Sequence, residues 1–209
     1  MRNVTWIISL IVFCMGSKGY ESGQKTVGVT SQCSGGLIND VSSKEDLRRR
    51  TGWSDAILDN IASREEAEIY IKAGLREARI GGRPALIRDD IDWADYSIRR
   101  NTWLKEYLAD YDKAAEYNNA DLIGEGYPPR DKGGNPYELH HIGQRPDSPL
   151  AELTVFEHRE NEGNYAVLHA AGKDSEIDRP QFEREKSAYW QARYKAFTPA
   201  EIDAIYRKR

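Results

Sequence analysis

All four histidines of this 209-residue chain lie in one short segment, at His140, His141, His158 and His169. Imidazole is the commonest metal ligand in proteins, and it is the side chain that titrates closest to neutral pH. Adjacent histidines can therefore divide metal binding and proton transfer between them. This histidine-bearing segment is the strongest chemical signal in the sequence.

The adjacent pair His140 and His141 is expected on a strand, behind a Gly-Gly-Asn-Pro turn and Glu138. Neighbouring residues on a strand point to opposite faces, so the two rings cannot easily bind the same metal ion. If His140 is a ligand, His141 faces the substrate and can take a proton from water.

The elements after the pair are expected to bring the other histidines close to it. Residues 145–149 read as a turn, 150–155 as a short strand, and 157–161 as a helical start that Gly163 interrupts. A helix from Pro180 to Phe197 follows, and a capping box with proline at its first helical position opens a last helix at Thr198.

The N-terminal third contains an expected leader and linker. Residues 1–19 combine Arg2, a short apolar run and small residues, which predicts a secretory signal peptide rather than a membrane span. A lipoprotein anchored through Cys14 is a weaker alternative, because Phe13 stands where a small residue is expected. Residues 20–43 are rich in Gly, Ser, Thr and Lys and predict a flexible linker.

The segment 44–125 is expected to be a mostly helical region. A helix starts at Ser54, and a capping box from Ser63 to Glu66 opens a second helix that stops at Gly74. The Gly81-Gly82 pair predicts a small β-hairpin. Aromatic residues at helical spacing predict one or two helices over residues 93–111, and 118–134 is expected to break regular structure.

Composition limits the classes of function. Charged residues make up 31% of the chain, which excludes an integral membrane body in the mature chain. The net charge of −4 counts against a general nucleic-acid binder, so phosphate chemistry would have to rely on local charge or a metal. Two cysteines, Cys14 and Cys33, are too few for a disulfide scaffold or a cysteine-ligated zinc site.

The motif Tyr137–His141 resembles the one that opens the nuclease site of DNase colicins, and residues 134–193 resemble the LHH family of the HNH/endonuclease VII superfamily. The family takes its name from Leu139-His140-His141. Residues 63–92 are also similar to a segment that often precedes this domain in polymorphic bacterial toxins. The further matching motifs are Ile142-Gly143-Gln144, the strand Pro149 to Thr154, Glu157-His158-Arg159, Leu168-His169 and Tyr189-Trp190.

The resemblance implies a ββα-metal nuclease, with His140 as the first metal ligand and His141 as the general base. It implies His158 as a second ligand. The colicin pattern puts its last histidine where this chain has Glu162, so His169 becomes the expected third ligand, with Asn164 or Glu162 as substitutes.

The resemblance also leaves roles for nearby charged groups. Glu138 is expected to orient a cation or the base, and Asn164 is a candidate catalytic residue. Arg145 and Arg159 are expected to contact phosphates of the substrate. One divalent ion is expected as cofactor, and three imidazoles suit zinc or nickel better than magnesium.

We therefore expect an α+β protein, with a mostly helical N-terminal region followed by an HNH-like nuclease domain over residues 126–209. The expected function is that of an exported endonuclease that hydrolyses DNA, as a bacterial toxin with a cognate immunity protein. RNA is an alternative substrate of the same fold. A non-catalytic, zinc-stabilised binding module of the envelope is a further alternative, whereas a metalloprotease is disfavoured because the chain lacks His-Glu-x-x-His.

Overall fold

The computed structural model describes residues 41–96, 112, 116–161, 163–169 and 177–207. The chain divides into two units, Met1–Ser34 and Gly35–Arg209, and all described residues belong to the second. The expected signal peptide, residues 20–40 of the expected linker and residues 97–111 of the expected aromatic helices lie outside the described residues. None of the described helices has the length and apolar character that a membrane crossing requires.

Helix α1 (Val41–Thr51) begins inside the linker expected over 20–43, so that linker was predicted too long. The sequence of this helix has no apolar period, because the helix buries few side chains. Leu47 is its fully buried side chain among those described. Exposed ion pairs from Arg48 to Asp55 and from Arg50 to Glu68 add weak contacts to the packing of Leu47.

Helices α2 (Asp55–Leu58) and α3 (Arg64–Lys72) form the predicted helical pair. The Ser63 hydroxyl accepts a hydrogen bond from the Glu66 amide, as the capping box predicts. The Glu66 carboxylate, however, accepts one hydrogen bond from the Ala62 amide. It accepts another from the Gly143 amide, which lies outside helix α3.

Strands β1 (Arg76–Ile80) and β2 (Arg83–Ile87) form the predicted antiparallel hairpin. Gly81 and Gly82 have φ of +58° and +83°, a region that glycine enters without steric cost.

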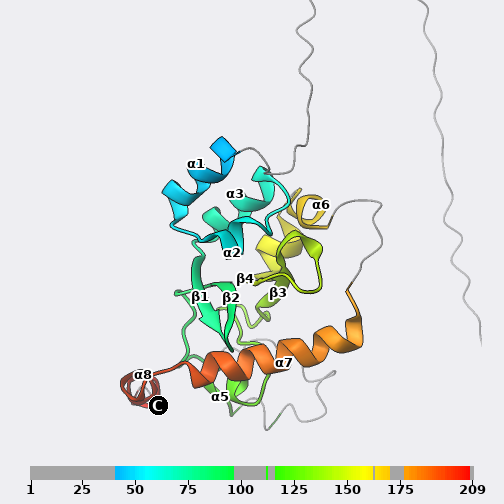
Figure 1. Cartoon of the computed structure of the whole chain (residues 1–209). Helices are drawn as coiled ribbons and strands as arrows, with labels where there is room; N and C mark the ends of the chain where they lie inside the picture. The colour runs from blue at the N-terminus through cyan, green and yellow to red at the C-terminus, as the bar shows by residue number, and fades with distance from the viewer. Residues whose placement is uncertain (1–40, 97–111, 113–115, 162, 170–176, 208–209) are drawn as a thin grey trace, which may run out of the picture. The chain divides into compact units, whose positions relative to one another are not determined.

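The hairpin is half of a four-stranded sheet whose other half carries the histidine motif. Strand β2 pairs in parallel with β4 (Leu150–Leu153), and β4 pairs antiparallel with β3 (Glu138–His141). The strand order is β1-β2-β4-β3 (Figure 1). Strands from both sides of the boundary expected near residue 125 therefore belong to one sheet.

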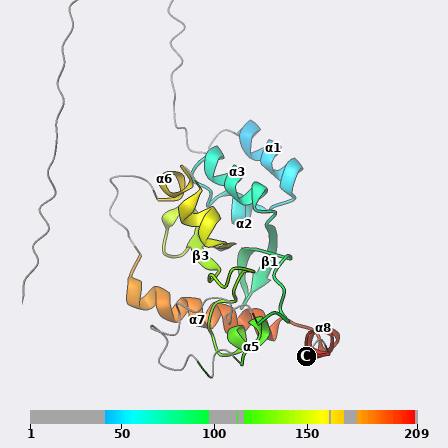
Figure 2. The ribbon, with the colours of Figure 1, turned by 180° about the vertical axis from the view of Figure 1, so that it is seen from behind.

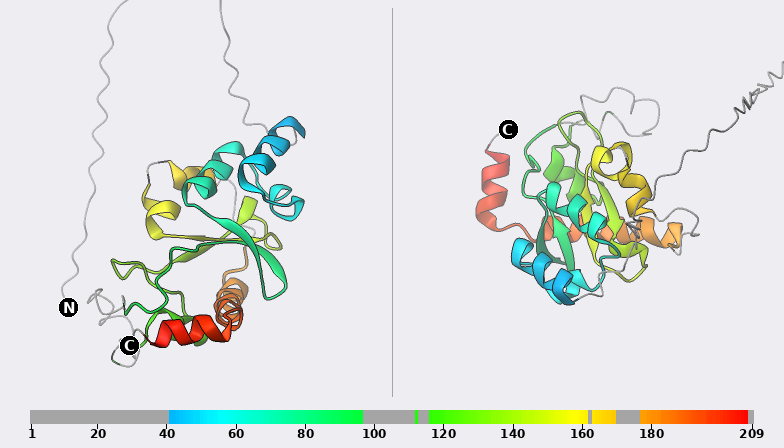
Figure 3. Two further views of the ribbon diagram at one scale, coloured as in Figure 1. Left: turned by 90° about the vertical axis from the view of Figure 1, so that its left-hand side faces the viewer. Right: turned by 90° about the horizontal axis from the view of Figure 1, so that it is seen from above.

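Each face of the sheet is covered by its own hydrophobic core (Figures 1 and 3). On β2 and β4, Leu86, Ala151 and Leu153 pack against α1, α2 and α3. Their neighbours on the opposite face pack against α5 (Asn119–Gly124) and α7 (Arg179–Lys195). Side chains on a strand alternate between faces, so the two cores are built from alternate residues of the same strands.

Helix α5 occupies part of the stretch 118–134, which we expected to lack regular structure. The helix is short, and it begins with a capping box between Asn118 and Asp121 that the prediction missed. The side-chain amide of Asn119 donates to the carbonyls of Asp92 and Arg130, so this buried residue links two loops.

The remaining elements follow the predicted order. After β4 come a π-helical turn η4 (Phe156–Glu160) and α6 (Asn164–Leu168), separated at Gly163, and α6 packs beside α3 (Figure 2). Helix α7 is the predicted helix through Trp190, and α8 (Pro199–Tyr206) has the predicted capping box of Thr198 and Glu201. An α+β fold, helical at its N-terminal end, is confirmed.

Candidate active site

Strand β3 places its two histidines on opposite faces of the sheet, as predicted. His140 faces α3, where its ring lies 6.5 Å from the ring of Tyr70. His141 faces α7, where its ring lies 4.5 Å from the ring of Phe182. Both histidines are 4% exposed, so each ring is fixed by its own core.

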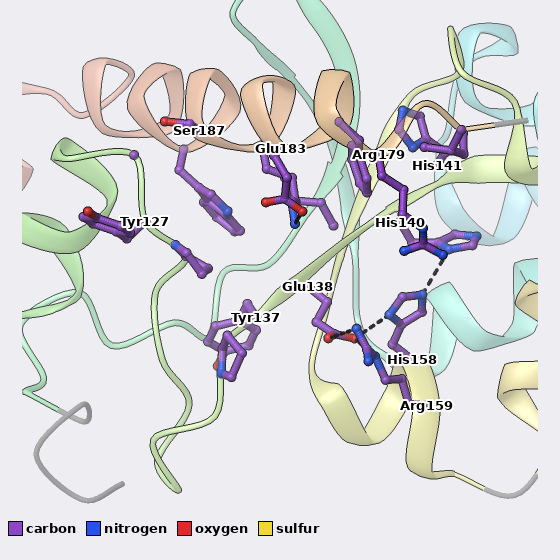
Figure 4. A pocket seen from close by; sticks show the side chains of 18 of the residues that line it. Tyr127, Tyr137, Glu138, His140, His141, His158, Arg159, Arg179, Glu183 and Ser187 are labelled. Carbon is purple, nitrogen blue, oxygen red and sulfur yellow. Dashed lines mark hydrogen bonds and ion pairs between the residues drawn. The ribbon is translucent and has the colours of Figure 1, made fainter. Parts of the chain in front are cut away.

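Three imidazoles converge on the α3 face, as expected for a metal site. His140 comes from β3, His158 from η4 and His169 from the C-terminal end of α6. One nitrogen of each ring lies within 4.8 Å of the others. Nδ1 of His140 and Nε2 of His158 are 3.2 Å apart (Figure 4). The three rings could hold one metal ion.

The protonation of this cluster fits metal binding. A histidine binds a metal in its neutral form. Burial lowers the pKa of His140 well below its ordinary value, and the nearby His158 and His169 rings lower it further. Burial also lowers the pKa of His169. The lowered pKa values of His140 and His169 favour the neutral rings that a cation needs. The nitrogen donors of the cluster suit zinc or nickel more than magnesium.

Glu138 lies behind His158 rather than beside the expected base. Nδ1 of His158 is 2.5 Å from the Glu138 carboxylate, which leaves Nε2 to face the other rings. Arg159 donates to the same carboxylate over 2.8 Å (Figure 4). Burial alone would raise the pKa of Glu138, but the bonds from His158 and Arg159 outweigh burial and lower it. Glu138 is thus placed to orient a ligand.

His141 has a carboxylate partner on α7. Its Nε2 lies 3.1 Å from Oε2 of Glu185, and Glu185 also pairs with Arg83 of β2. Burial lowers the pKa of His141, whereas Glu185 and a hydrogen bond to the Pro146 carbonyl act to raise it. The ring is held by two acceptors outside the three-histidine cluster.

All four histidines line one cavity of about 720 Å³ between β3, η4, α6 and α7. Arg159, Arg179 and Lys186 supply positive charge to its wall. Glu125, Glu138 and Glu183 supply an equal number of carboxylates. Most of the side chains labelled in Figure 4 come from β3, η4 and α7, whereas Tyr127 and Tyr137 come from the stretch between α5 and β3.

The other predicted site residues are not in this cavity. The Asn164 side-chain amide donates to the Glu157 carbonyl over 2.8 Å, which ties α6 to η4. Arg145 bonds the Asp59 carbonyl and the Asn60 side chain, away from the cavity wall. Glu162, the alternative ligand, lies outside the described residues.

Sequence reasoning missed Glu185, Arg179 and Ser187 of α7, which the structure brings to the site or its cavity. Glu185 lies 44 residues after His141 and has no local motif that links the two. Only the way α7 crosses the sheet brings it to the ring, so the sequence alone contained no signal for it.

Comparison with known proteins gives one match. Residues 118–196 match the model of the LHH family, described as a nuclease of the HNH/ENDO VII superfamily with conserved LHH. No curated protein and no solved structure matches the chain. The match includes α5, β3, β4, the histidine cluster and α7, and starts upstream of the boundary expected at residue 126. Over residues 118–196 the chain therefore matches the LHH family of nucleases, as the motif Leu139–His141 predicted.

Proposed function

We propose that this protein is an exported, metal-dependent endonuclease that hydrolyses DNA phosphodiester bonds. One observation carries the proposal: three imidazoles meet on one face of β3, and a fourth lies on the other face, with all four lining the same cavity. Metal-assisted hydrolysis requires both a site for the metal ion and a separate general base.

The metal would be held by His140, His158 and His169. A divalent ion there supplies a Lewis acid that polarises the phosphate and neutralises charge on the leaving oxygen. Glu138 orients the His158 ring for this task through its bond to Nδ1.

His141 is the proposed general base, which takes a proton from the attacking water. Its neighbours Glu185 and Pro146 fix the ring and stabilise its protonated form. Arg159, Arg179 and Lys186 are proposed to contact phosphates, because they are the cations of the cavity wall.

DNA is proposed as the substrate on the resemblance to DNase colicins. Contacts to phosphates alone do not distinguish DNA from RNA, so RNA is the second substrate to test. Export through residues 1–19, a role as a bacterial toxin and a cognate immunity protein are proposed on the leader-like sequence and the resemblance to toxin segments.

The test is a nicking assay on supercoiled plasmid, with a structured RNA in parallel. The full chain is stripped with a chelator and reloaded with zinc, nickel or magnesium. Cutting that stops with chelator and returns with a metal supports the proposal. Failure to cut either nucleic acid with any of these ions contradicts it, and a protein that still binds zinc would then fit a zinc-stabilised binding module.

Two variants test the assigned roles. His141→Ala is expected to abolish cutting while zinc content is retained, because this ring lies outside the cluster. His140→Ala is expected to lose both zinc and cutting. Loss of zinc in His141→Ala, or full activity in that variant, would show that the roles are wrongly assigned.

A further inference from the structure

A buried carboxylate on helix α3, that of Glu66, lies close to the histidine cluster. Glu66 is 2% exposed and lies outside the residues that match the LHH family. Its Oε1 is 3.9 Å from Nε2 of His140. Among the described residues, that nitrogen has no hydrogen-bond partner, although His140 is almost fully buried.

The two nitrogens of His140 face different neighbours. Nδ1 lies 3.2 Å from Nε2 of His158 and so points into the cluster. Nε2 points the other way, towards Glu66. For Nδ1 to offer a lone pair to a metal, the hydrogen of the neutral ring must sit on Nε2. A buried N–H group needs an acceptor, and the Glu66 carboxylate lies in front of it.

Glu66 is held in place by groups that all donate to it. Oε1 accepts from the Tyr70 hydroxyl over 2.6 Å and from the Gly143 amide over 2.7 Å. Oε2 accepts from the Ala62 amide over 2.6 Å. Each of these bonds is one that a carboxylate oxygen accepts. Burial raises the pKa of Glu66, whereas these donors act to lower it. The bond to Gly143 also fixes the turn that follows the histidine pair.

We propose that Glu66 is a positioning residue of the metal centre, which accepts a hydrogen bond from Nε2 of His140 and so fixes this ring with Nδ1 towards the metal. Glu138 orients His158 in the same way, through its carboxylate 2.5 Å from Nδ1 of that ring. The centre thus has two supporting carboxylates, one from inside the LHH domain and one from the helical segment that precedes it. This inference rests on the proposed metal binding at the histidine cluster.

The wild-type protein gives the first test. Long-range 1H–15N correlation spectra of the zinc-loaded full chain report which nitrogen of each histidine carries hydrogen. We expect His140 with hydrogen on Nε2 and zinc on Nδ1. Hydrogen on Nδ1 of His140 would overturn the inference, and this result does not depend on any variant that might misfold.

Zinc affinity gives the second test, measured by competition with a chelator. Glu66→Gln and Glu138→Gln are each expected to bind zinc about 10- to 100-fold more weakly than the wild type. Loss of the carboxylate that accepts a hydrogen bond from a metal-binding histidine typically has this effect. Tyr70→Phe is the matched control, since it removes a bond to the same oxygen but leaves Oε1 free for His140. It is expected to change zinc affinity less than about threefold, well below that range.

Thermal unfolding of the metal-free proteins separates positioning from folding. If Glu66→Gln and Tyr70→Phe lower the melting temperature alike but only Glu66→Gln weakens zinc binding, the inference is supported. Equal zinc affinity in all three proteins overturns it. A wild-type chain that binds no zinc would instead contradict the proposed function, so the two failures are distinguishable.

Discussion

The His141 ring lies between two acceptors, the Glu185 carboxylate at Nε2 and the Pro146 carbonyl. Burial favours the neutral ring, which can take a proton, and the two acceptors favour the protonated ring that results. A base that is neutral at rest and stabilised after proton transfer meets both requirements of the hydrolytic step. We therefore propose that Glu185 supports His141 in its role as the general base.

Glu185→Gln is expected to lower the nicking rate about tenfold or more, within the contribution of general-base catalysis, because the amide stabilises the protonated ring less. Zinc affinity should stay at the wild-type value, since Glu185 is not part of the cluster. Single-turnover cutting and zinc competition measure the two effects. A faster variant would mean that Glu185 restrains the base instead of supporting it.

The two arginines predicted to bind phosphate have different surroundings. Arg159 lines the cavity, whereas Arg145 bonds to the loop after α2. Arg159→Gln is expected to weaken substrate binding and to reduce the slope of log affinity against log salt by about one. Arg145→Gln is the matched control and should leave that slope unchanged. Equal effects of the two variants on DNA binding at several salt concentrations would contradict this division.

The local motif singled out His140, His141, His158 and His169, and the fold brings these four rings to one cavity. Adjacent strand residues alternate faces, so the separation of the pair followed from backbone geometry. Glu66 and Glu185 could not be predicted, because each reaches its histidine through the packing of a distant helix.

Strand β4 shows how one element serves both faces of the sheet. Ala151 and Leu153 pack beneath α1, α2 and α3, while Glu152 points to α7 and is fully buried. The Glu152 carboxylate accepts from Arg193 over 3.1 Å and from the Tyr189 hydroxyl over 2.8 Å. Burial raises its pKa, although these bonds act to lower it. The ion pair therefore fixes α7, and with it Glu185, against the sheet.

Arg193→Met is expected to lower the free energy of unfolding by about 3–5 kcal/mol, because it leaves a buried carboxylate without its cation. Arg207→Met is the control, since its exposed pair with Asp203 should contribute less than about 1 kcal/mol. Urea unfolding measures both. Burial raises the pKa of Glu152, and loss of Arg193 raises it further. The difference in unfolding free energy between the wild type and Arg193→Met should therefore shrink as the pH falls, because protonation removes the buried charge.

Elements with a local signal were predicted well. The Gly81-Gly82 turn gave the hairpin, and the capping residues Ser63 and Thr198 marked two helix starts. Helix α1 was missed because Leu47 is its fully buried side chain among those described, so the helix has no apolar period. The parallel pairing of β2 with β4 was missed because it joins strands more than sixty residues apart, which no local pattern encodes.

At the scale of the whole unit, the helical segment and the LHH domain meet at the turn after the histidine pair. The Gly143 amide donates to Glu66, and Gly143 has φ of +65°. A Cβ atom at this position would overlap the Asn60 carbonyl oxygen. The close approach of the two backbones, together with the shared sheet, makes the described segment from α2 to β2 part of the structure that supports the site.

Gly143→Ala tests this contact, and Gly74→Ala is its control. Gly74 has φ of +68°, but a Cβ atom there would meet nothing within 4 Å, so both variants carry a similar backbone strain of about 1–2 kcal/mol. Only Gly143→Ala must also push Asn60 away, which should cost a further 1–3 kcal/mol or so. Because that movement shifts Glu66 and β3 apart, zinc affinity should fall in Gly143→Ala alone. Equal unfolding free energies and equal zinc affinities for the two variants would show that the helical segment is not coupled to the metal site.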